Sequence, residues 1–484
     1  MNFEFILKDL RPSEEEKEKT IKVCTKVINF LNATCMEENL DCEAMLVGSV
    51  AKNTWLSGKS DIDIFIHFPL STDESILKEK GLELAYKTSN ALNGKASEHY
   101  ASHPYLTSEI DGFEIDFVPC YLIKDGSELK SAVDRTILHT RYIQANLSNE
   151  QCDEVLLLKR FMDCVGTYGS EFKTGGFAGY LCELLILEYG TFENTLVQAQ
   201  NWKFGTVIDL ENYNTEDKFK DPLITIDPTD KNRNVGAALR LEKMVEFIIA
   251  SRNFIDLIND NDLKTEEKEE RIKKFFKALE KAQLENKERN EIIENIKKDF
   301  KDHETQTLAI KFNIPEISAD SLHPQLFKTV ESLSEKLMNE EFSVFKYDYW
   351  TNENDFAVFI LELNVFKQSK YIIHEGPKIW AKKACDNFKG KWEDATFPNG
   401  EFLVIKKERK FKTATQFIKH VLTKEHIRTI KVGKGIKESL CNDYELLEID
   451  EFLDHLDENI NKNEQFELLN KLDDFLNPGQ YLKR

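Results

Sequence analysis

The spacing of hydrophobic and polar residues predicts a chain that mixes helices and strands from its first segments onward. Residues 13–34 carry apolar side chains at helical spacing, and Ser13 with Glu16 forms a capping box that predicts where the helix begins. A strand–loop–strand unit, a helix and two further strands are expected next, at 44–68, 72–92, 99–105 and 113–121. This order indicates an α+β domain that ends near Tyr142.

Beyond this domain the pattern becomes mainly helical and then mixed. Two strongly apolar helices are expected at Val155–Val165 and Phe177–Glu188, with a glycine-containing loop between them. Residues 260–302 are rich in Lys and Glu with helical periodicity, which predicts solvated helices, read as an insertion. Strands alternating with helices are then expected at 307–312, 357–363 and 401–407, followed by two amphipathic helices in 443–484.

Length and composition favour a protein of several domains outside a membrane. The 484 residues suffice for roughly three or four domains of ordinary size. No apolar run approaches the ~20 residues that a membrane span needs, and the first residues lack the layout of a signal peptide. We therefore expect no membrane partner and a cytoplasmic location. The nine cysteines form no CxxC pair, which favours reduced, buried thiols over a zinc site.

The formal net charge of −21 argues, taken alone, against a nucleic-acid partner. Phosphate binding needs Lys and Arg, and much of the affinity comes from the counterions that the nucleic acid releases when these residues bind it. Net charge is a sum over the whole chain, however, whereas binding depends on local patches. The composition therefore lowers the expectation of an RNA substrate without excluding one.

The candidate chemistry lies in Gly48-Ser49 followed by Asp61-Ile62-Asp63. Residues two apart on a strand share a face, so Asp61 and Asp63 are expected to project together while Ile62 points into the core. Two carboxylates side by side on a rigid strand suit a pair of Mg²⁺ ions. The Gly-Ser pair lets the backbone approach a triphosphate closely, and the hydroxyl of Ser49 can bond to it.

A third carboxylate is expected from a neighbouring strand. Asp116 is flanked by apolar residues on both sides, and metal ligation would explain why a carboxylate is buried there. Glu114 shares the same face and is the competing candidate. Together these residues predict a two-metal nucleotidyl transfer, in which Asp61 and Asp63 bridge two Mg²⁺ ions and Asp116 acts on one of them. The competing interpretation is an ordinary polar face of a surface strand.

Several motifs, taken in order, resemble the class I, archaeal-type CCA-adding enzymes, which are tRNA nucleotidyltransferases of the polymerase-β superfamily. The fingerprint is Gly48-Ser49 leading into Asp61-Ile62-Asp63, followed by Ile115-Asp116-Phe117-Val118-Pro119. The later matching segments are 131–136, 157–161, 168–171, 176–185, 227–228 and 233–235, with thinner similarity in 317–326, at 376–377 and in 410–415. The resemblance covers most of the chain.

This resemblance implies a fold and a division of the chain. The fold is α+β and multidomain, with a polymerase-β-like palm built on a mixed sheet, a helical neck, and an α/β body and tail. The implied parts are a catalytic palm, a helical neck that completes the nucleotide site, a charged helical insertion, a tRNA-binding body and tail, and an acidic helical extension, at 1–145, 146–258, 259–303, 304–442 and 443–484.

The resemblance also assigns residues. Asp61, Asp63 and Asp116 match the metal-binding carboxylates. The positions that match nucleotide contacts are Ser49, Lys52, His139, Lys159, Tyr168 and Arg233, with Thr136 nearby. Ser49 and Lys52 match triphosphate-contacting positions, and Arg233 matches an arginine that recognises the incoming base. Two positions depart from the usual pattern: 61 is often Glu and is Asp here, and 52 is often Arg and is Lys here, a point charge instead of a bidentate fork.

The implied reaction is addition of C, C and A from CTP and ATP to the 3′ end of tRNA without a nucleic-acid template. Cytosine and adenine both carry an amino donor beside a ring-nitrogen acceptor, so the donors of Arg233 can satisfy the ring nitrogen of either. Uracil and guanine would leave buried groups unpaired, at about 1–3 kcal/mol each. A basic face for tRNA is expected near the C-terminus, at Lys406, Lys407, Arg409, Lys410, Arg428 and Lys431.

Two alternatives stay open on the sequence alone. Another polymerase-β-type RNA nucleotidyltransferase, such as a poly(A) polymerase, shares the superfamily signature. A non-catalytic RNA-binding protein on the same fold is the second, although the intact carboxylates at positions 61, 63 and 116 argue against it. The sequence leaves the oligomeric state undecided, a homodimer included.

Overall fold

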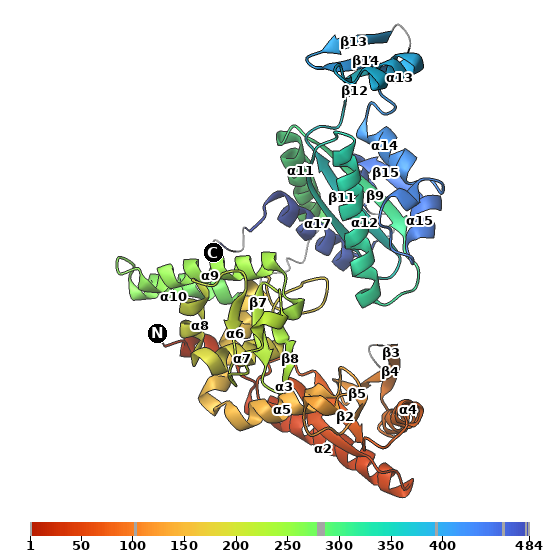
Figure 1. Cartoon of the computed structure of the whole chain (residues 1–484). Helices are drawn as coiled ribbons and strands as arrows, with labels where there is room; N and C mark the ends of the chain where they lie inside the picture. Colours follow the sequence, from red (N-terminus) through yellow and green to blue (C-terminus); the bar gives the residue numbers. More distant parts are fainter. Residues whose placement is uncertain are drawn as a thin grey trace. The chain divides into compact units, whose positions relative to one another are not determined.

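The computed structural model describes residues 2–100, 104–277, 286–392, 395–456, 460–479 and 482. It forms two compact units (Figure 1), which comprise Met1–Glu280 with Gly479–Arg484, and Lys281–Pro478. Both units combine sheets with helices, which confirms the predicted α+β class. Within the described ranges, no helix has the length and apolar character to cross a membrane.

The first unit begins with a five-stranded mixed sheet in the order β1-β2-β5-β4-β3. Its elements are α1 (Glu4–Leu10), α2 (Glu14–Glu37), β1 (Glu43–Val47), α3 (Gly48–Ala51), β2 (Ile62–Phe68), α4 (Glu74–Ala91), β3 (Lys95–Tyr100), β4 (Pro104–Ile110), β5 (Phe113–Tyr121) and α5 (Arg135–Asn146). The single strand expected at 99–105 is wrong. His99 and Tyr105 pair across an antiparallel ladder, so this segment joins two strands, and 101–103 lie outside the described residues.

The two faces of this sheet have different partners, as a two-residue repeat requires. Ile62, Ile64 and Phe117 lie in the core that α2 and α4 contribute to. Phe65 and Cys120, on the alternate positions, pack with Ile137 of α5. Asp63 and Asp116 therefore belong to the face turned toward α5, away from the larger core.

The rest of the first unit is helical around a small sheet of order β6-β7-β8. Its elements are α6 (Asn149–Cys164), α7 (Gly179–Tyr189), α8 (Phe192–Ala199), β6 (Thr206–Ile208), β7 (Leu223–Asp227), β8 (Asp230–Asn234), α9 (Leu241–Asn259) and α10 (Thr265–Phe276). The prediction that α10 is merely solvated is wrong. Ile272 and Phe275 are fully buried, and Phe275 stacks on Phe161 of α6 because its apolar positions form one helical face.

The second unit is built on an antiparallel sheet of order β10-β11-β9-β15. Its main elements are α11 (Asn286–Asp302), β9 (Gln306–Asn313), α12 (Ala319–Asn339), β10 (Val344–Thr351), β11 (Phe356–Leu363), α14 (Ala414–Val421), α15 (Lys437–Asn442), β15 (Tyr444–Glu448), α16 (Ile449–Asp454) and α17 (Lys462–Leu476). Both faces of β11 are buried, Phe359 against α12 and α14 and Ile360 against α11, α16 and α17. The two helices expected over 443–484 are α16 and α17, and β15 precedes them in this segment and completes the sheet.

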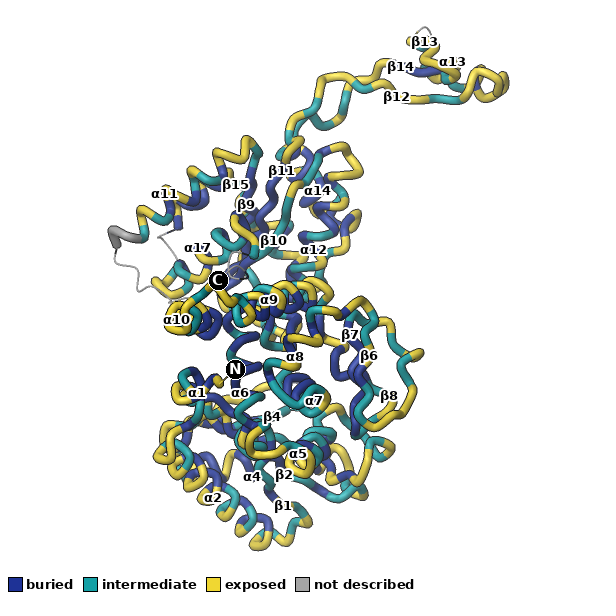
Figure 2. The backbone as a smooth tube through the Cα atoms, turned by 90° about the vertical axis from the view of Figure 1, so that its left-hand side faces the viewer, coloured by how far each residue is buried: buried dark blue, intermediate teal, exposed yellow. Residues whose placement is uncertain are grey.

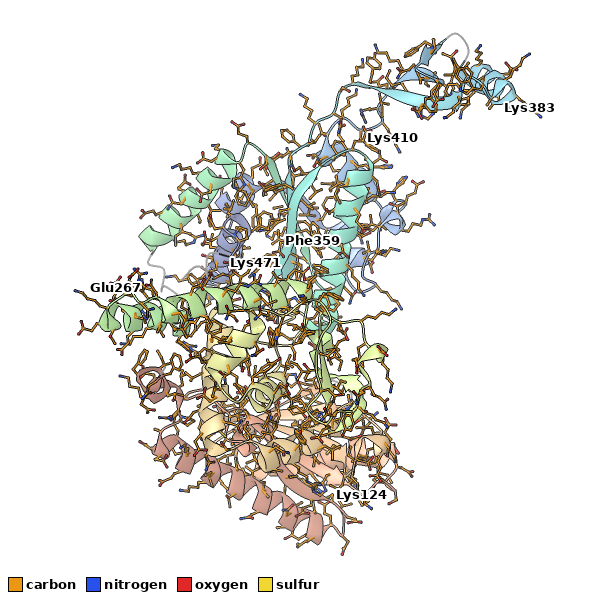
Figure 3. All side chains as sticks on the ribbon, turned by 60° about the vertical axis from the view of Figure 1, so that its left-hand side comes forward. Lys124, Glu267, Phe359, Lys383, Lys410 and Lys471 are labelled. Carbon is orange, nitrogen blue, oxygen red and sulfur yellow. The ribbon has the colours of Figure 1, made fainter. Side chains whose placement is uncertain are left out.

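A second, smaller sheet of order β12-β14-β13 lies between β11 and α14 in the sequence. It contains β12 (Tyr371–Lys378), α13 (Lys382–Trp392), β13 (Thr396–Asn399) and β14 (Phe402–Glu408). Its elements are largely exposed (Figure 2), and Lys383 of α13 points into solvent (Figure 3). A bridge between Lys367 and Thr413 joins the two connecting segments, which hold the small sheet to the larger one as a two-stranded stalk.

Candidate active site

Asp63 and Asp116, two of the predicted carboxylates, lie opposite each other on neighbouring strands. β2 and β5 are parallel, and their register pairs Asp63 with Asp116. Strands paired in this way are about 4.8 Å apart, so the two side chains leave the same face side by side. Asp61 directly precedes β2 and is exposed. Glu114, the competing candidate, is exposed and precedes the β2–β5 register, which begins with Ile62 and Ile115, so the register favours Asp116.

The carboxylates repel one another in a poorly solvated place. Burial, followed by the charges of Asp116 and Asp61, raises the pKa of Asp63 to about 6. Clustered carboxylates of this kind are the hard oxygen donors that divalent cations take, and a bound cation would relieve the repulsion. In the described part of the chain, no three His, Cys, Asp or Glu side chains are already arranged around one metal position. These clustered carboxylates are chemically suited to a divalent ion. Because they are not yet arranged around one position, their side chains have to rotate before they can share an ion.

Thr107 of β4 holds Asp116, a contact that the sequence did not suggest. The Thr107 hydroxyl donates to Asp116 Oδ1 at 2.5 Å from the directly opposite position of the ladder. Burial raises the pKa of Asp116, and this hydrogen bond opposes that shift. Thr107 therefore fixes the orientation of one carboxylate and favours its ionised form.

Gly48 leaves the space that Asp63 occupies. Val47 pairs with Asp63, and Gly48 follows with a φ of +72° at the start of α3. A Cβ at Gly48 would lie 1.9 Å from Asp63 Oδ2, closer than any real contact. A glycine is thus needed at position 48 for two reasons: any Cβ would clash with the Asp63 carboxylate, and the φ is positive. Both reasons are separate from the predicted close approach of a triphosphate. Ser49 follows it in α3 and is half-buried.

Lys52 and Lys159 share one buried carboxylate, Glu183 of α7. Lys52 Nζ lies 2.6 Å from Glu183 Oε2, and Lys159 Nζ lies 3.7 Å from Oε1. Lys159 also donates to the Thr54 carbonyl at 2.8 Å, and the Thr54 hydroxyl donates to Glu183 Oε1 at 2.6 Å. Burial alone would raise the pKa of Glu183, but the two ammonium groups outweigh it and hold that pKa below its ordinary value. The group joins the segment after β1 to the helical half of the unit.

Tyr168 lies beside the same group. A Cβ at Gly179 would be 3.2 Å from the Tyr168 hydroxyl and 3.6 Å from Lys159 Nζ, so all three meet at the first residue of α7. Burial raises the pKa of Tyr168, which keeps its hydroxyl protonated and able to donate. The structure thus brings together Lys52, Lys159 and Tyr168, which the sequence placed in one nucleotide site.

His139 and Arg233 share a second buried carboxylate, Asp227 at the end of β7. Asp227 Oδ2 accepts from Arg233 Nη1 at 2.9 Å and lies 2.9 Å from His139 Nε2. The His139 ring stacks on Tyr180 of α7, with centroids 3.9 Å apart and planes 16° apart. Arg233 also lines a pocket of about 420 Å³, together with Arg135 and other residues of this half of the unit.

Four of the residues that build this site were assigned no role from the sequence, although the last three lie in matching segments: Thr107, Tyr180, Glu183 and Asp227. Glu183 left a signal, because it interrupts the apolar run from Tyr180 to Leu187 and a buried carboxylate needs a partner. Asp227 ends a short, fully buried strand and could have been suspected on the same ground. Thr107 left none, because its role depends on the pairing of β4 with β5.

The residues predicted to bind tRNA lie in the second unit, around the small sheet and the segment after α14. Lys406 and Lys407 are exposed on β14, with Lys406 Nζ 4.3 Å from the centre of the Tyr371 ring. Arg409 differs, because its Nη2 lies 2.5 Å from Glu341 Oε2 and only 16% of its side chain is exposed. Lys410 Nζ lies 3.0 Å from His420 Nε2. Arg428 and Lys431 follow α14, in and just after a short 3₁₀ turn.

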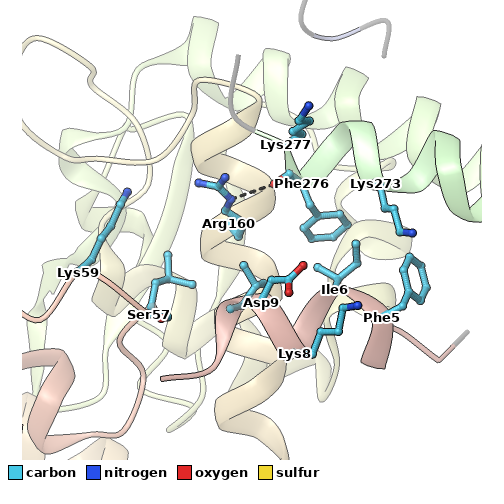
Figure 4. Close-up of a pocket in the computed structure, with 12 residues that line it drawn as sticks. Phe5, Ile6, Lys8, Asp9, Ser57, Lys59, Arg160, Lys273, Phe276 and Lys277 are labelled. Carbon is cyan, nitrogen blue, oxygen red and sulfur yellow. Dashed lines mark hydrogen bonds between the residues drawn. The ribbon is translucent and has the colours of Figure 1, made fainter. Parts of the chain in front are cut away.

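A further pocket of the first unit, of about 510 Å³, contains none of the predicted site residues (Figure 4). It lies between α1, the segment before β2, α6 and α10. Arg160 Nε donates to the Phe276 carbonyl at 3.0 Å at its edge, which ties α10 to α6. The pocket is therefore separate from the carboxylates.

Three family models match successive parts of the chain. Residues 27–139 match the nucleotidyltransferase domain, 153–262 the second domain of tRNA nucleotidyltransferase, and 303–448 the C-terminal domain of CCA-adding enzyme. The first match holds all three predicted metal carboxylates, and the second holds Glu183, Asp227 and Arg233.

Relatives match over nearly the whole chain. A CCA-adding enzyme of Methanothermobacter thermautotrophicus is 42% identical over 479 residues, which is 99% of this chain and 98% of that protein. One of Methanosarcina acetivorans is 35% identical, with 92% of each chain covered. Among solved structures, the RNA terminal uridylyl transferase Cid1 is 12% identical and covers 57% of this chain and 96% of its own, with a TM-score of 0.45, too low to bear on the assignment.

Proposed function

This chain belongs to the CCA-adding enzymes, and on that premise we propose that it adds C, C and A from CTP and ATP to the 3′ end of tRNA. The observation that carries the proposal is the pairing of Asp63 with Asp116 across β2 and β5, with Asp61 just before β2. This is the donor set that nucleotidyl transfer through two divalent ions requires.

The ions proposed for this site are Mg²⁺, held by Asp61, Asp63 and Asp116. When bound, Mg²⁺ supplies Lewis acidity to the attacking 3′-hydroxyl and to the leaving pyrophosphate. The protein contributes the orientation of the carboxylates, through Thr107 and the space at Gly48. We assign Ser49, Lys52, Lys159 and Tyr168 to the triphosphate side of the nucleotide, and His139 and Arg233 to its nucleoside side.

The tRNA is proposed to contact the small sheet of the second unit. Residues 364–413 contain twelve Lys or Arg and six Asp or Glu, a local charge of +6 in a chain of −21. Trp380, in the turn after β12, is 76% exposed, and Phe397 of β13 is 39% exposed, which provides flat apolar surfaces among the cations. Cations for phosphate beside exposed rings are typical of RNA-binding surfaces.

Extension of a tRNA that lacks its terminal CCA tests the proposal. Purified protein with Mg²⁺ is expected to add two C residues and one A, and to stop. Asp116→Ala is expected to lose about 10³-fold or more in rate, because a metal carboxylate supplies several kcal/mol of stabilisation. Glu114→Ala, an exposed carboxylate of the same strand, is the matched control and is expected to keep activity. A long A tail, or no incorporation at all, would show that the proposed function is wrong.

A further inference from the structure

We propose that Asp227 is a positioning residue for nucleotide selection, which fixes Arg233 and His139 in the orientation from which they meet the incoming nucleotide. The inference rests on the proposed function, in which Arg233 recognises the base. It adds that the choice of base depends on a carboxylate behind the arginine, buried where it has no surface to offer to the nucleotide itself.

Asp227 gathers groups from three elements. Its Oδ2 binds Arg233 of β8 and His139 of α5, each at 2.9 Å. Its Oδ1 accepts from the Thr229 backbone N–H at 2.9 Å and from the Thr229 hydroxyl at 2.8 Å, and the Tyr180 hydroxyl of α7 lies 3.5 Å away. The two oxygens therefore have separate tasks, one toward the turn and one toward the nucleotide residues.

The carboxylate holds its partners firmly because it is buried and stays charged. The Asp227 side chain has no exposed surface, whereas 34% of Arg233 is exposed. Burial alone would raise the pKa of Asp227, but His139 and Arg233 keep it well below its ordinary value. A charge-assisted hydrogen bond is shorter and stronger than a neutral one, so the guanidinium is anchored at one corner.

Anchoring matters because an arginine that can rotate does not discriminate. A guanidinium has five N–H donors in a planar fork and no acceptor. Once Asp227 holds Nη1, the remaining donors can point in only one direction, where cytosine and adenine offer a ring nitrogen. A free arginine could instead turn to the acceptors of uracil or guanine, and the penalty for an unpaired group would disappear.

The competing role for Asp227 is purely structural, as the residue that closes the turn between β7 and β8. Two control variants separate the roles. Thr229→Val removes the hydroxyl from Oδ1 and leaves Oδ2 with Arg233 and His139. Asp221→Asn changes another carboxylate of this region, whose Oδ2 accepts from Asn234 Nδ2 at 2.8 Å instead of from Arg233.

The test variant is Asp227→Asn, measured on tRNA ending in its discriminator base with each of the four nucleotides. The amide oxygen can still accept from Thr229, while the amide nitrogen faces the donors of Arg233, which has no acceptor to offer. The ratio of kcat/KM for CTP over UTP is expected to fall about tenfold to a hundredfold, and KM for CTP to rise more than kcat falls. Both control variants are expected to keep the wild-type ratio.

The outcomes separate this proposal from the proposed function. If wild type prefers C and A and Asp227→Asn shows the same degree of preference, only the proposed role of Asp227 is overturned. A wild-type protein without that preference overturns both. If Asp227→Asn loses its cooperative thermal transition, Asp227→Glu provides the same measurement, because it keeps the charge and displaces the guanidinium by one methylene. An unchanged ratio in Asp227→Glu also overturns the proposal.

Discussion

Lys52 Nζ lies 2.6 Å from Glu183 Oε2, across 131 positions of sequence. Only 8% of the Lys52 side chain is exposed, and Glu183 has no exposed surface. A lysine predicted to meet a triphosphate is therefore already paired, and its counter-charge also neutralises Lys159. An ammonium group poised in this way needs little reorganisation when an anion arrives beside it.

Glu183→Gln is predicted to destabilise the first unit strongly. The change leaves Lys52 and Lys159 as buried positive charges without a counter-ion, which costs about 3–5 kcal/mol. Urea unfolding checks the free energy of unfolding. Glu188→Gln, an exposed position of the same helix, is the control and is expected to change it by less than about 0.5 kcal/mol. Equal effects of the two variants would show that the buried pairs contribute no net stability.

The carboxylates of the site could be predicted from the sequence because their geometry is local. The two-residue repeat of a strand places Asp61 and Asp63, and the apolar neighbours of Asp116 mark it as enclosed. Glu183 and Asp227 could not be assigned to their partners, because those contacts join elements that are distant in sequence. Local patterns identify which residues need a partner, and the tertiary fold decides which partner each one finds.

The same distinction applies to the fold. The helices α2, α6 and α7 follow from apolar periodicity, but β8 does not, because its sequence Asp-Lys-Asn-Arg-Asn carries no apolar alternation. That strand exists because β7 beside it is fully buried and the tight turn at Asp227 returns the chain to it. The burial of Phe275 in α10 was missed for a related reason, since a high content of Lys and Glu masks a narrow apolar face.

Gly48→Ala is predicted to lower the rate of nucleotide incorporation by about 10²-fold or more. The new Cβ would lie 1.9 Å from Asp63 Oδ2, so the carboxylate must move out of its place beside Asp116. Gly58→Ala is the matched control: its φ of +74° is similar, and a Cβ there meets nothing within 4 Å. Both variants carry a backbone penalty of about 1 kcal/mol, and only the first should lose activity. Equal activity in both variants contradicts the packing argument.

Thr107→Val is predicted to weaken the binding of Mg²⁺ at Asp116, and with it the activity, without unfolding the sheet. The isosteric change removes the hydroxyl that donates to Asp116 Oδ1 at 2.5 Å. Loss of a residue that orients a metal ligand typically costs about 10- to 100-fold in metal affinity or activity. A titration of activity against Mg²⁺ concentration measures the change, and Thr107→Ser, which keeps the hydroxyl, is expected to restore the wild-type curve. A normal curve for Thr107→Val would remove Thr107 from the site.

Neutralising Lys406 and Lys407 on the small sheet is predicted to weaken tRNA binding and to flatten its salt dependence. Each lost phosphate contact reduces the slope of log K against log salt by about one unit. Arg409 is left unchanged because it pairs with Glu341. Lys298→Ser with Lys301→Ser on α11, two exposed cations outside the small sheet, is the control. An unchanged slope in the Lys406 and Lys407 variant would place the basic face elsewhere.

Lowering the pH is predicted to reduce the stability of the protein, because the unfolded chain then takes up a proton at His139. Burial lowers the pKa of His139 below the ordinary 6.5, even though Asp227 opposes this shift. The unfolded chain therefore binds a proton more readily than the folded one, so stability is full above about pH 6.5 and is lost as pH falls from there toward the folded pKa. One such group gives a slope of at most about 1.4 kcal/mol per pH unit. Unfolding of wild type and His139→Gln between pH 8 and 5.5 measures it, and equal slopes for the two proteins would mean that His139 is not the group that titrates.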